Sequence, residues 1–146
     1  YQTITGISKM ESEDIIDLPH DGQVWLLDFW ATWCPPCQAP MAHNQKMLEE
    51  NPDWEGKIKI IGLSIDQDKK KLKSHVEAKG WGKVEHYFRG TSDASTVYGV
   101  NGVPHVMLID KTGKIVFKGH PASRPDLKGD MEKLANGEMP EGLGGS

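Results

Sequence analysis

An apolar run that leads directly into a pair of cysteines constrains this chain more than any other feature. The run covers residues 24–30, reads Val-Trp-Leu-Leu-Asp-Phe-Trp, and is interrupted only by Asp28. Continuous runs of this length are typical of strands buried on both faces in a parallel sheet. Residues 35–50 follow as a predicted helix, because their prolines fall in the first turn, where a missing N–H is tolerated. The pattern predicts a strand-to-helix corner with Cys34 at the helix start and Cys37 one turn inside.

The rest of the chain extends this corner into an α/β fold. A second buried strand is predicted over 57–65, and the predicted helices cover 69–79, 92–98 and 124–135. A third strand over 106–110 turns tightly into a fourth over 115–118. Alternating strands and helices imply a parallel core with helices on both sides, and the closing hairpin adds an antiparallel edge.

The length of 146 residues suits one domain over 1–146, with residues 1–20 as an N-terminal extension and the Gly-rich 137–146 as a flexible tail. We expect a monomer. The net charge of −4 argues against nucleic acid as a partner. No apolar run approaches the ~18 residues of a membrane span. Because the chain begins at Tyr1, we expect a segment upstream, and the compartment stays open between an extracytoplasmic one (processed or membrane-anchored upstream) and the cytoplasm.

The two cysteines, the only ones in the chain, lie in Trp33-Cys34-Pro35-Pro36-Cys37. This spacing closes a small disulfide ring, which removes little entropy from the unfolded chain and therefore favours redox chemistry over a structural staple. A helix N-terminus favours the thiolate, so we expect a lowered pKa for Cys34. Cys34 is the predicted attacking thiol and Cys37, deeper in the helix, the resolving one.

The two prolines between the cysteines limit how far the pKa of Cys34 is expected to fall. Pro35 and Pro36 donate no N–H to a thiolate at Cys34, and no histidine or cation lies between the cysteines. We therefore expect a moderately reducing potential, nearer roughly −270 mV than roughly −120 mV. This interpretation makes the protein a reductant.

Two separated segments carry a family resemblance. Residues 27–37 resemble the active-site segment of the thioredoxin superfamily, and residues 98–104 resemble the segment with that family's cis-proline loop. Within the superfamily the chain is most similar to the TlpA/ResA-type thiol-disulfide oxidoreductases, with tryparedoxins and nucleoredoxins as near relatives. The resemblance implies a thioredoxin-like three-layer α/β/α fold, whose central mixed sheet carries an inserted helical element between Asp66 and Tyr98.

The resemblance also implies roles for individual residues. The Val103–Pro104 peptide would be cis and face the disulfide, so that the Val103 backbone could pair with an extended substrate segment. Asp28 matches the family's buried acid behind Cys37, and burial would raise its pKa and let it exchange a proton with that thiol, directly or through a water. Trp33 and the two prolines would form part of the substrate surface.

Four positions depart from the family pattern. Pro40 stands where related proteins often have a glutamate, and Ala42 where a helix-kinking proline is common. Gly62 matches the position of a lysine near the buried acid of thioredoxin, and His105 replaces the threonine that follows the cis-proline. These differences leave the thiol chemistry intact and the potential and partner preference open.

The resemblance implies protein disulfides or dithiols as substrates, together with an electron donor that the sequence does not identify. It implies no cofactor other than the Cys34–Cys37 disulfide and no metal. An alternative is a chaperone-like module, similar to Sco-type copper proteins, that binds Cu(I) or Zn(II) through Cys34, Cys37 and His105. A thiol peroxidase is disfavoured, because Thr32-Trp33-Cys34 lacks the family's Thr-x-x-Cys spacing.

Several residues have a plain structural interpretation. Asp28 can be a satisfied buried carboxylate, although an aspartate in an apolar strand is destabilising without a purpose. His105 reads as a residue at the rim of the site. The other histidines are predicted to lie on the surface: His20, His43, His75, His86 and His120. Four tryptophans are predicted to pack in the core: Trp25, Trp30, Trp54 and Trp81.

Overall fold

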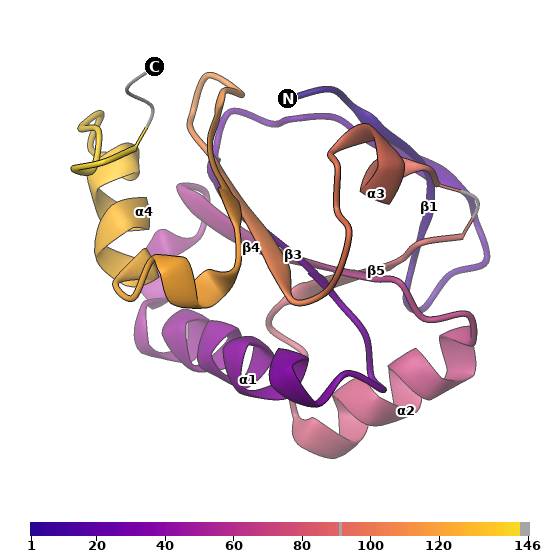
Figure 1. Cartoon of the computed structure of the whole chain (residues 1–146). Coiled ribbons are helices and arrows are strands. Elements are labelled where there is room, and N and C mark those ends of the chain that lie inside the picture. The colour runs from indigo at the N-terminus through magenta and orange to yellow at the C-terminus, as the bar shows by residue number, and fades with distance from the viewer. Residues whose placement is uncertain (91, 144–146) are drawn as a thin grey trace.

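The computed structural model describes residues 1–90 and 92–143, which form a seven-stranded mixed sheet with helices on both faces (Figure 1). The strands follow the order β2-β1-β5-β4-β3-β6-β7. β3, β4 and β5 are parallel, and the outer strands join them in antiparallel fashion. The strand bounds are β1 Ile4–Lys9, β2 Ile16–Leu18, β3 Val24–Trp30, β4 Ile58–Ser64, β5 Glu85–Phe88, β6 His105–Ile109 and β7 Ile115–Gly119.

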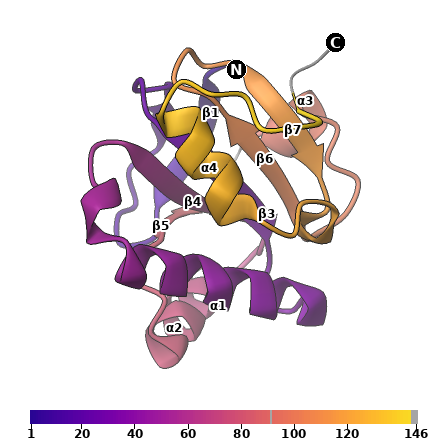
Figure 2. The same ribbon diagram turned by 90° about the vertical axis from the view of Figure 1, so that its left-hand side faces the viewer.

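The helices form the outer two layers. Their bounds are α1 Pro35–Glu50, α2 Lys69–Lys79, α3 Ala94–Val97 and α4 Leu127–Ala135, with short 3-10 turns at Pro52–Trp54 and Pro121–Ser123. Apolar residues of α1, α2 and α4 share one core with the sheet, whereas Ala94 of α3 belongs to a second core on the opposite face. In Figure 2, α4 lies in front of the sheet and α1 runs below it. This arrangement confirms the three-layer fold.

β3 is the central strand, and all seven of its residues are buried. It pairs in parallel with β4 and antiparallel with β6, so both of its edges are hydrogen-bonded as well. Its side chains point alternately into the two cores: Trp30 packs on the α1 side and Phe29 on the α3 side. A continuous apolar run is the composition that such a strand requires.

Local chemistry sets the ends of α2, whose bounds match the predicted helix. The Asp68 side chain accepts hydrogen bonds from the backbone N–H groups of Lys70 and Lys71, which is an N-cap. Gly80 ends the helix in the left-handed conformation, with φ of 74°, and its N–H bonds to the Val76 and Glu77 carbonyls. The insertion that contains α2 is therefore a defined element of the fold.

Three strands go beyond the prediction. The segment from Asp66 to Tyr98 contains α2 and α3 as expected, but also β5, which pairs in parallel with β4. The segment 1–20 contributes β1 and β2, and β1 pairs with β5. In the predicted tail, Pro140 and Leu143 are buried, and residues 144–146 lie outside the described residues.

Candidate active site

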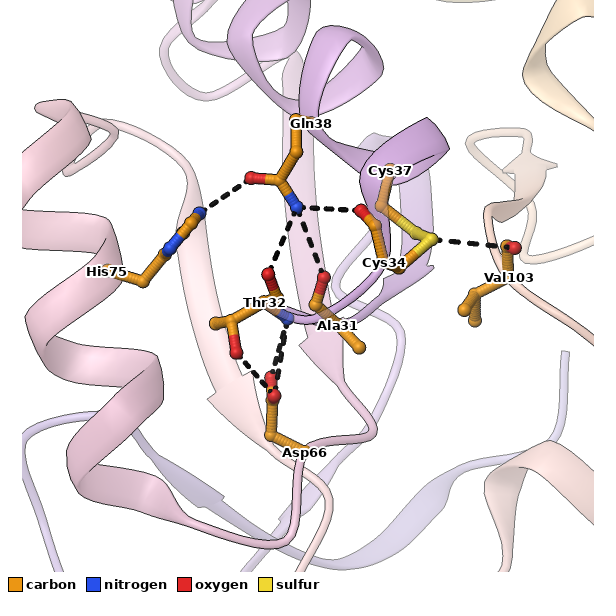
Figure 3. Close-up of a disulfide and its surroundings, with 8 residues drawn as sticks. All are labelled: Ala31, Thr32, Cys34, Cys37, Gln38, Asp66, His75 and Val103. Carbon is orange, nitrogen blue, oxygen red and sulfur yellow. Dashed lines mark hydrogen bonds between the residues drawn. A yellow bond between two sulfur atoms is a disulfide. The ribbon is translucent and has the colours of Figure 1, made fainter.

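Cys34 and Cys37 form a disulfide at the start of α1, where the chain leaves β3 (Figure 3). Cys34 is the N-cap residue, and its side chain retains a small exposed fraction of 4%. Cys37 lies in the first turn and is fully buried. Cys34 is therefore the more exposed of the two cysteines.

The loop before β6 faces the disulfide from across the site. The Val103–Pro104 peptide bond is cis, and the Val103 carbonyl oxygen lies 3.7 Å from Cys34 Sγ (Figure 3). In the disulfide this sulfur carries no hydrogen, so the approach is a contact, whereas the reduced thiol can donate to the same oxygen. The two segments that the sequence singled out therefore meet in one site.

The rim of the site is apolar and open. Trp33, which directly precedes Cys34 in the chain, is 65% exposed, and Pro35 and Pro36 are also exposed. Large exposed apolar side chains beside a reactive group are typical of a protein-docking surface. Trp25, Trp30, Trp54 and Trp81 are buried, as predicted.

The start of α1 offers few hydrogen-bond donors to a sulfur anion. Its first two positions are Pro35 and Pro36, which have no N–H, and the Cys37 N–H is bonded to the Cys34 carbonyl at 3.2 Å. The helix dipole remains as the main influence that favours a thiolate at Cys34. Pro40 lies inside α1, where it removes one further intrahelical hydrogen bond.

Asp28 is fully buried on the α1 side of β3. Asn44 of α1 donates to its Oδ2 at 3.0 Å, whereas Oδ1 has no hydrogen-bond partner among the described residues. Removal from water raises the pKa of Asp28 to about 8, and the hydrogen bond from Asn44 opposes this shift. The carboxyl is thus poised to bind and release a proton near neutral pH.

A polar link joins α2 to the cysteine loop (Figure 3). The Gln38 amide donates to the carbonyls of Ala31, Thr32 and Cys34, at 3.3, 3.4 and 2.8 Å. Its Oε1 lies 2.6 Å from Nε2 of His75 on α2, and because an amide oxygen only accepts, the ring nitrogen donates. The inserted helix therefore holds the side chain that anchors the loop.

A buried carboxylate fixes the other side of the same loop. Asp66 accepts hydrogen bonds from the Thr32 backbone N–H and from the Thr32 hydroxyl, the latter at 2.7 Å, and also from the Ser64 hydroxyl. Asp66 lies two residues after the end of β4, so it ties the loop to the strand beside β3. The loop from Ala31 to Cys34 is thus held by Gln38 of α1 and by Asp66 after β4.

His105 does not join the cysteines. It pairs in register with Phe29 and contacts the Phe29 ring, which places it on the opposite face of the sheet from Asp28. Within residues 1–90 and 92–143, no group of three or more His, Cys, Asp or Glu side chains is placed to hold a metal ion. The metal-binding alternative based on Cys34, Cys37 and His105 therefore has no support.

The surface prediction for His86 is wrong. The side chain is only 7% exposed, lies on the unpredicted strand β5, and contacts the Trp30 ring. Sequence reasoning also missed the roles of Asn44, Gln38 and Asp66. Helical periodicity offered a signal for Asn44, which lies two turns after Cys37 on the same face of α1, whereas no local pattern pointed to Asp66.

Three features of the fold and the site together characterise a class of protein. They are a mixed sheet, a disulfide at the start of the first long helix, and a cis-proline loop that faces this disulfide. A family model described as thioredoxin-like matches residues 22–115. The chain belongs to this thioredoxin-like family.

Similar proteins refine the assignment. Thiol-disulfide oxidoreductase ResA of Bacillus anthracis is 34% identical over 129 residues, which cover 86% of this chain and 69% of that protein. Thiol:disulfide interchange protein DsbE of Escherichia coli (strain K12) is 28% identical over 102 residues, 70% of this chain and 52% of that protein. The structure of a thiol-disulfide oxidoreductase from Bacteroides fragilis NCTC 9343 shares the fold, with a TM-score of 0.74 at 19% identity, over 90% of this chain and 96% of that one. The resemblance to ResA-type proteins is confirmed.

Proposed function

We propose that this protein is a dithiol-disulfide oxidoreductase that reduces disulfides of other proteins through Cys34 and Cys37. The observation that carries the proposal is the asymmetric disulfide at the start of α1, in which Cys34 is the more exposed cysteine and its sulfur lies 3.7 Å from the Val103 carbonyl. The two named relatives, one an oxidoreductase and the other an interchange protein, support the same chemistry.

The reaction has two exchange steps. The Cys34 thiolate of the reduced protein attacks a substrate disulfide, forms a mixed disulfide and releases the first substrate thiolate, which takes up a proton. Cys37 then loses its proton to the Asp28 carboxylate and attacks the Cys34 sulfur of the mixed disulfide. The second substrate sulfur leaves as a thiolate and takes up a proton from the Asp28 carboxyl or from water, and the Cys34–Cys37 disulfide is restored. Two electrons pass from the dithiol to the substrate.

The substrate surface follows from the rim. An extended peptide that carries the disulfide can pair with the Val103 backbone as an added strand, while Trp33 and the two prolines contact its side chains. This surface recognises backbone and apolar groups, which suits protein substrates better than small thiols. An external electron donor must then reduce the disulfide again.

The function is tested by trapping. In Cys37→Ser the second step cannot occur, so we expect a mixed disulfide between Cys34 and the target protein, identifiable by mass spectrometry after non-reducing electrophoresis. The matched variant Cys34→Ser should trap no target, because the buried Cys37 is not accessible. Equal trapping by both variants would contradict the assigned order of attack. Failure of the wild-type protein to reduce insulin disulfides would contradict the reductase activity itself.

The potential tests the direction of electron flow. With two prolines at the helix start, we expect a value nearer roughly −270 mV than roughly −120 mV. Equilibration with glutathione or dithiothreitol buffers measures it. A value above about −150 mV would instead indicate an oxidant.

A further inference from the structure

A row of three residues crosses the parallel strands behind the disulfide. Asp28 of β3 pairs in register with Gly62 of β4, and Gly62 pairs in register with His86 of β5. Residues in register in a parallel sheet point to the same face. Asp28 and His86 therefore face each other across a residue that has no side chain.

Two polar atoms and a methyl group close over Gly62 on the face where it has no side chain. A Cβ at residue 62 would lie 3.0 Å from His86 Nδ1 and 3.1 Å from Trp30 Nε1, with Met41 Cε of α1 covering the same point at 3.2 Å. Over the described ranges, neither nitrogen has a hydrogen-bond partner, and the same holds for Oδ1 of Asp28. Buried polar groups are destabilising unless they are hydrogen-bonded, so each of these three atoms calls for a hydrogen-bond partner.

The donor and acceptor roles of the three atoms are complementary. His86 Nε2 lies 2.8 Å from the Trp81 carbonyl and must donate to it, which leaves Nδ1 of the neutral ring as an acceptor. Burial lowers the pKa of His86 and favours this neutral ring. Trp30 Nε1–H is a donor. Protonated Asp28 is a donor too, through Oδ1, since Asn44 donates to Oδ2.

Two donors and one acceptor match the capacity of a single water molecule. Such a water accepts from Trp30 and from the Asp28 carboxyl and donates to His86, which satisfies the usual requirement of two to four polar partners. Strands are spaced by about 4.8 Å, so the Cα atoms of Asp28 and His86 lie about 10 Å apart, a span that the two side chains close with one water between them.

We propose that His86 is a positioning residue for Asp28, which it reaches across Gly62 through one water molecule that Trp30 also binds. The proposal rests on the proposed role of Asp28 as the proton acceptor of Cys37. In that step the S–H bond of Cys37 breaks and an O–H bond forms on Asp28. His86 takes no proton; it accepts the hydrogen bond that stabilises the protonated carboxyl, and so sets the pH range in which Asp28 can act.

Other charged groups lie on the far side of His86. An open pocket of about 620 Å³ borders His86, and its other titratable lining residues are Lys9, Glu11, Glu77, Glu85 and Tyr87. The ring of His75 contacts Trp30 and Trp81 rather than His86. Asp28 itself faces uncharged neighbours, Asn44, Gly62 and Val106. On α4, which packs against β3, the buried Asp130 is paired with Arg124 at 2.8 Å. The pocket groups are open to water and screened, whereas the link through Gly62 is buried.

The first test uses the wild-type fold. In the oxidised protein, the ¹⁵N resonance of His86 Nδ1 should shift with the ionisation of Asp28, which is followed independently by the ¹³C resonance of its carboxyl. In Asp28→Asn the chemical shift of His86 Nδ1 should stay constant over the same pH range. A His86 resonance that ignores Asp28 in the wild-type protein would overturn the proposal.

The second test removes the acceptor. His86→Gln can keep the donor to the Trp81 carbonyl but lacks the ring nitrogen that faces Gly62. Loss of the acceptor disfavours the neutral carboxyl, so the pKa of Asp28 should fall by at least about half a unit, and the pH profile of disulfide exchange should move down with it. Gly62→Ala places a Cβ between His86 and Asp28. In this variant the His86 Nδ1 resonance should no longer follow the ionisation of Asp28. The exposed His43→Gln is the matched control.

The outcomes separate the two proposals. An unchanged Asp28 titration in His86→Gln would overturn the coupling, even if that variant were less stable. A wild-type exchange rate in Asp28→Asn from pH 6 to 9 would refute the proton-transfer role of Asp28. In that case the coupling would have no role in catalysis. The coupling itself would still be testable, because the resonances of His86 Nδ1 and of the Asp28 carboxyl are measured without any turnover.

Discussion

At the scale of single residues, Asp28 is the most unusual group of the molecule. It is a fully buried carboxyl in an apolar strand, and one of its oxygens is held by Asn44. Its raised pKa has a consequence for stability as well as for catalysis. In the folded protein the carboxyl has a pKa of about 8 and is only partly ionised at neutral pH, whereas in the unfolded chain it ionises near its ordinary value of 3.8.

We predict that the stability of the fold decreases as the pH rises between these two values. In this window the folded state binds more protons than the unfolded state, so the contribution of neutral Asp28 is complete below pH 4 and is lost as the pH approaches 8. Asp28→Asn cannot ionise and should show a smaller decrease. Urea unfolding at pH 5, 6, 7 and 8 measures the difference, and parallel curves for the two proteins would contradict the prediction.

At the scale of elements, the site depends on how α2 is tied to the start of α1. Gln38 donates to three carbonyls of the cysteine loop and is itself held by His75 of α2. The spacing of the cysteines predicted the ring and the helix start, but it gave no sign of this anchor. Gln38 reads in the sequence as an ordinary helical residue, and its partner lies on a different helix.

We predict that Gln38→Ala destabilises the protein by about 1–2 kcal/mol, because partly buried carbonyls lose their donor. Thermal and urea unfolding of the oxidised protein measure the loss. The exposed Gln67→Ala, a substitution of the same type outside this link, should change the stability by less than about 0.5 kcal/mol. Equal effects of the two substitutions would show that the link to α2 contributes nothing specific.

At the scale of the whole molecule, the N-terminal segment completes the sheet. β1 lies beside β5, and its Ile7 is fully buried in the second core, the core to which Trp25 and Phe29 of the central strand β3 also belong. Any partner at this edge of the sheet therefore meets β2, not the parallel strands that carry the site.

Among the helices in the described part of the chain, none combines the length and the apolar composition that a membrane span requires.

We predict that Ile7→Ala lowers the free energy of unfolding by about 2–5 kcal/mol, the range for truncating a large aliphatic side chain in a core. Thr5→Ala, exposed on the same strand, should have a small effect. Chemical denaturation of both variants is the measurement. An equally small effect at Ile7 would mean that β1 is dispensable to the fold.

The sequence by itself determined the strand-to-helix corner, the place of the cysteine pair at that corner, and the family. These depend on features that act over a few residues: a continuous apolar run, prolines in a first helical turn, and a cysteine at a helix start. It failed for β1, β2 and β5, which are short and lack a clear apolar pattern, because their strand state depends on pairing with one another and with β4.

Only the tertiary structure decided what surrounds Asp28. The sequence matched Gly62 to a position near the buried acid, but it placed His86 on the surface. Three strands far apart in the sequence had to pair in register before Asp28, Gly62 and His86 formed one row. Register is set by the packing of whole strands against the two cores, and no local pattern in the chain encodes which side chains it will bring face to face.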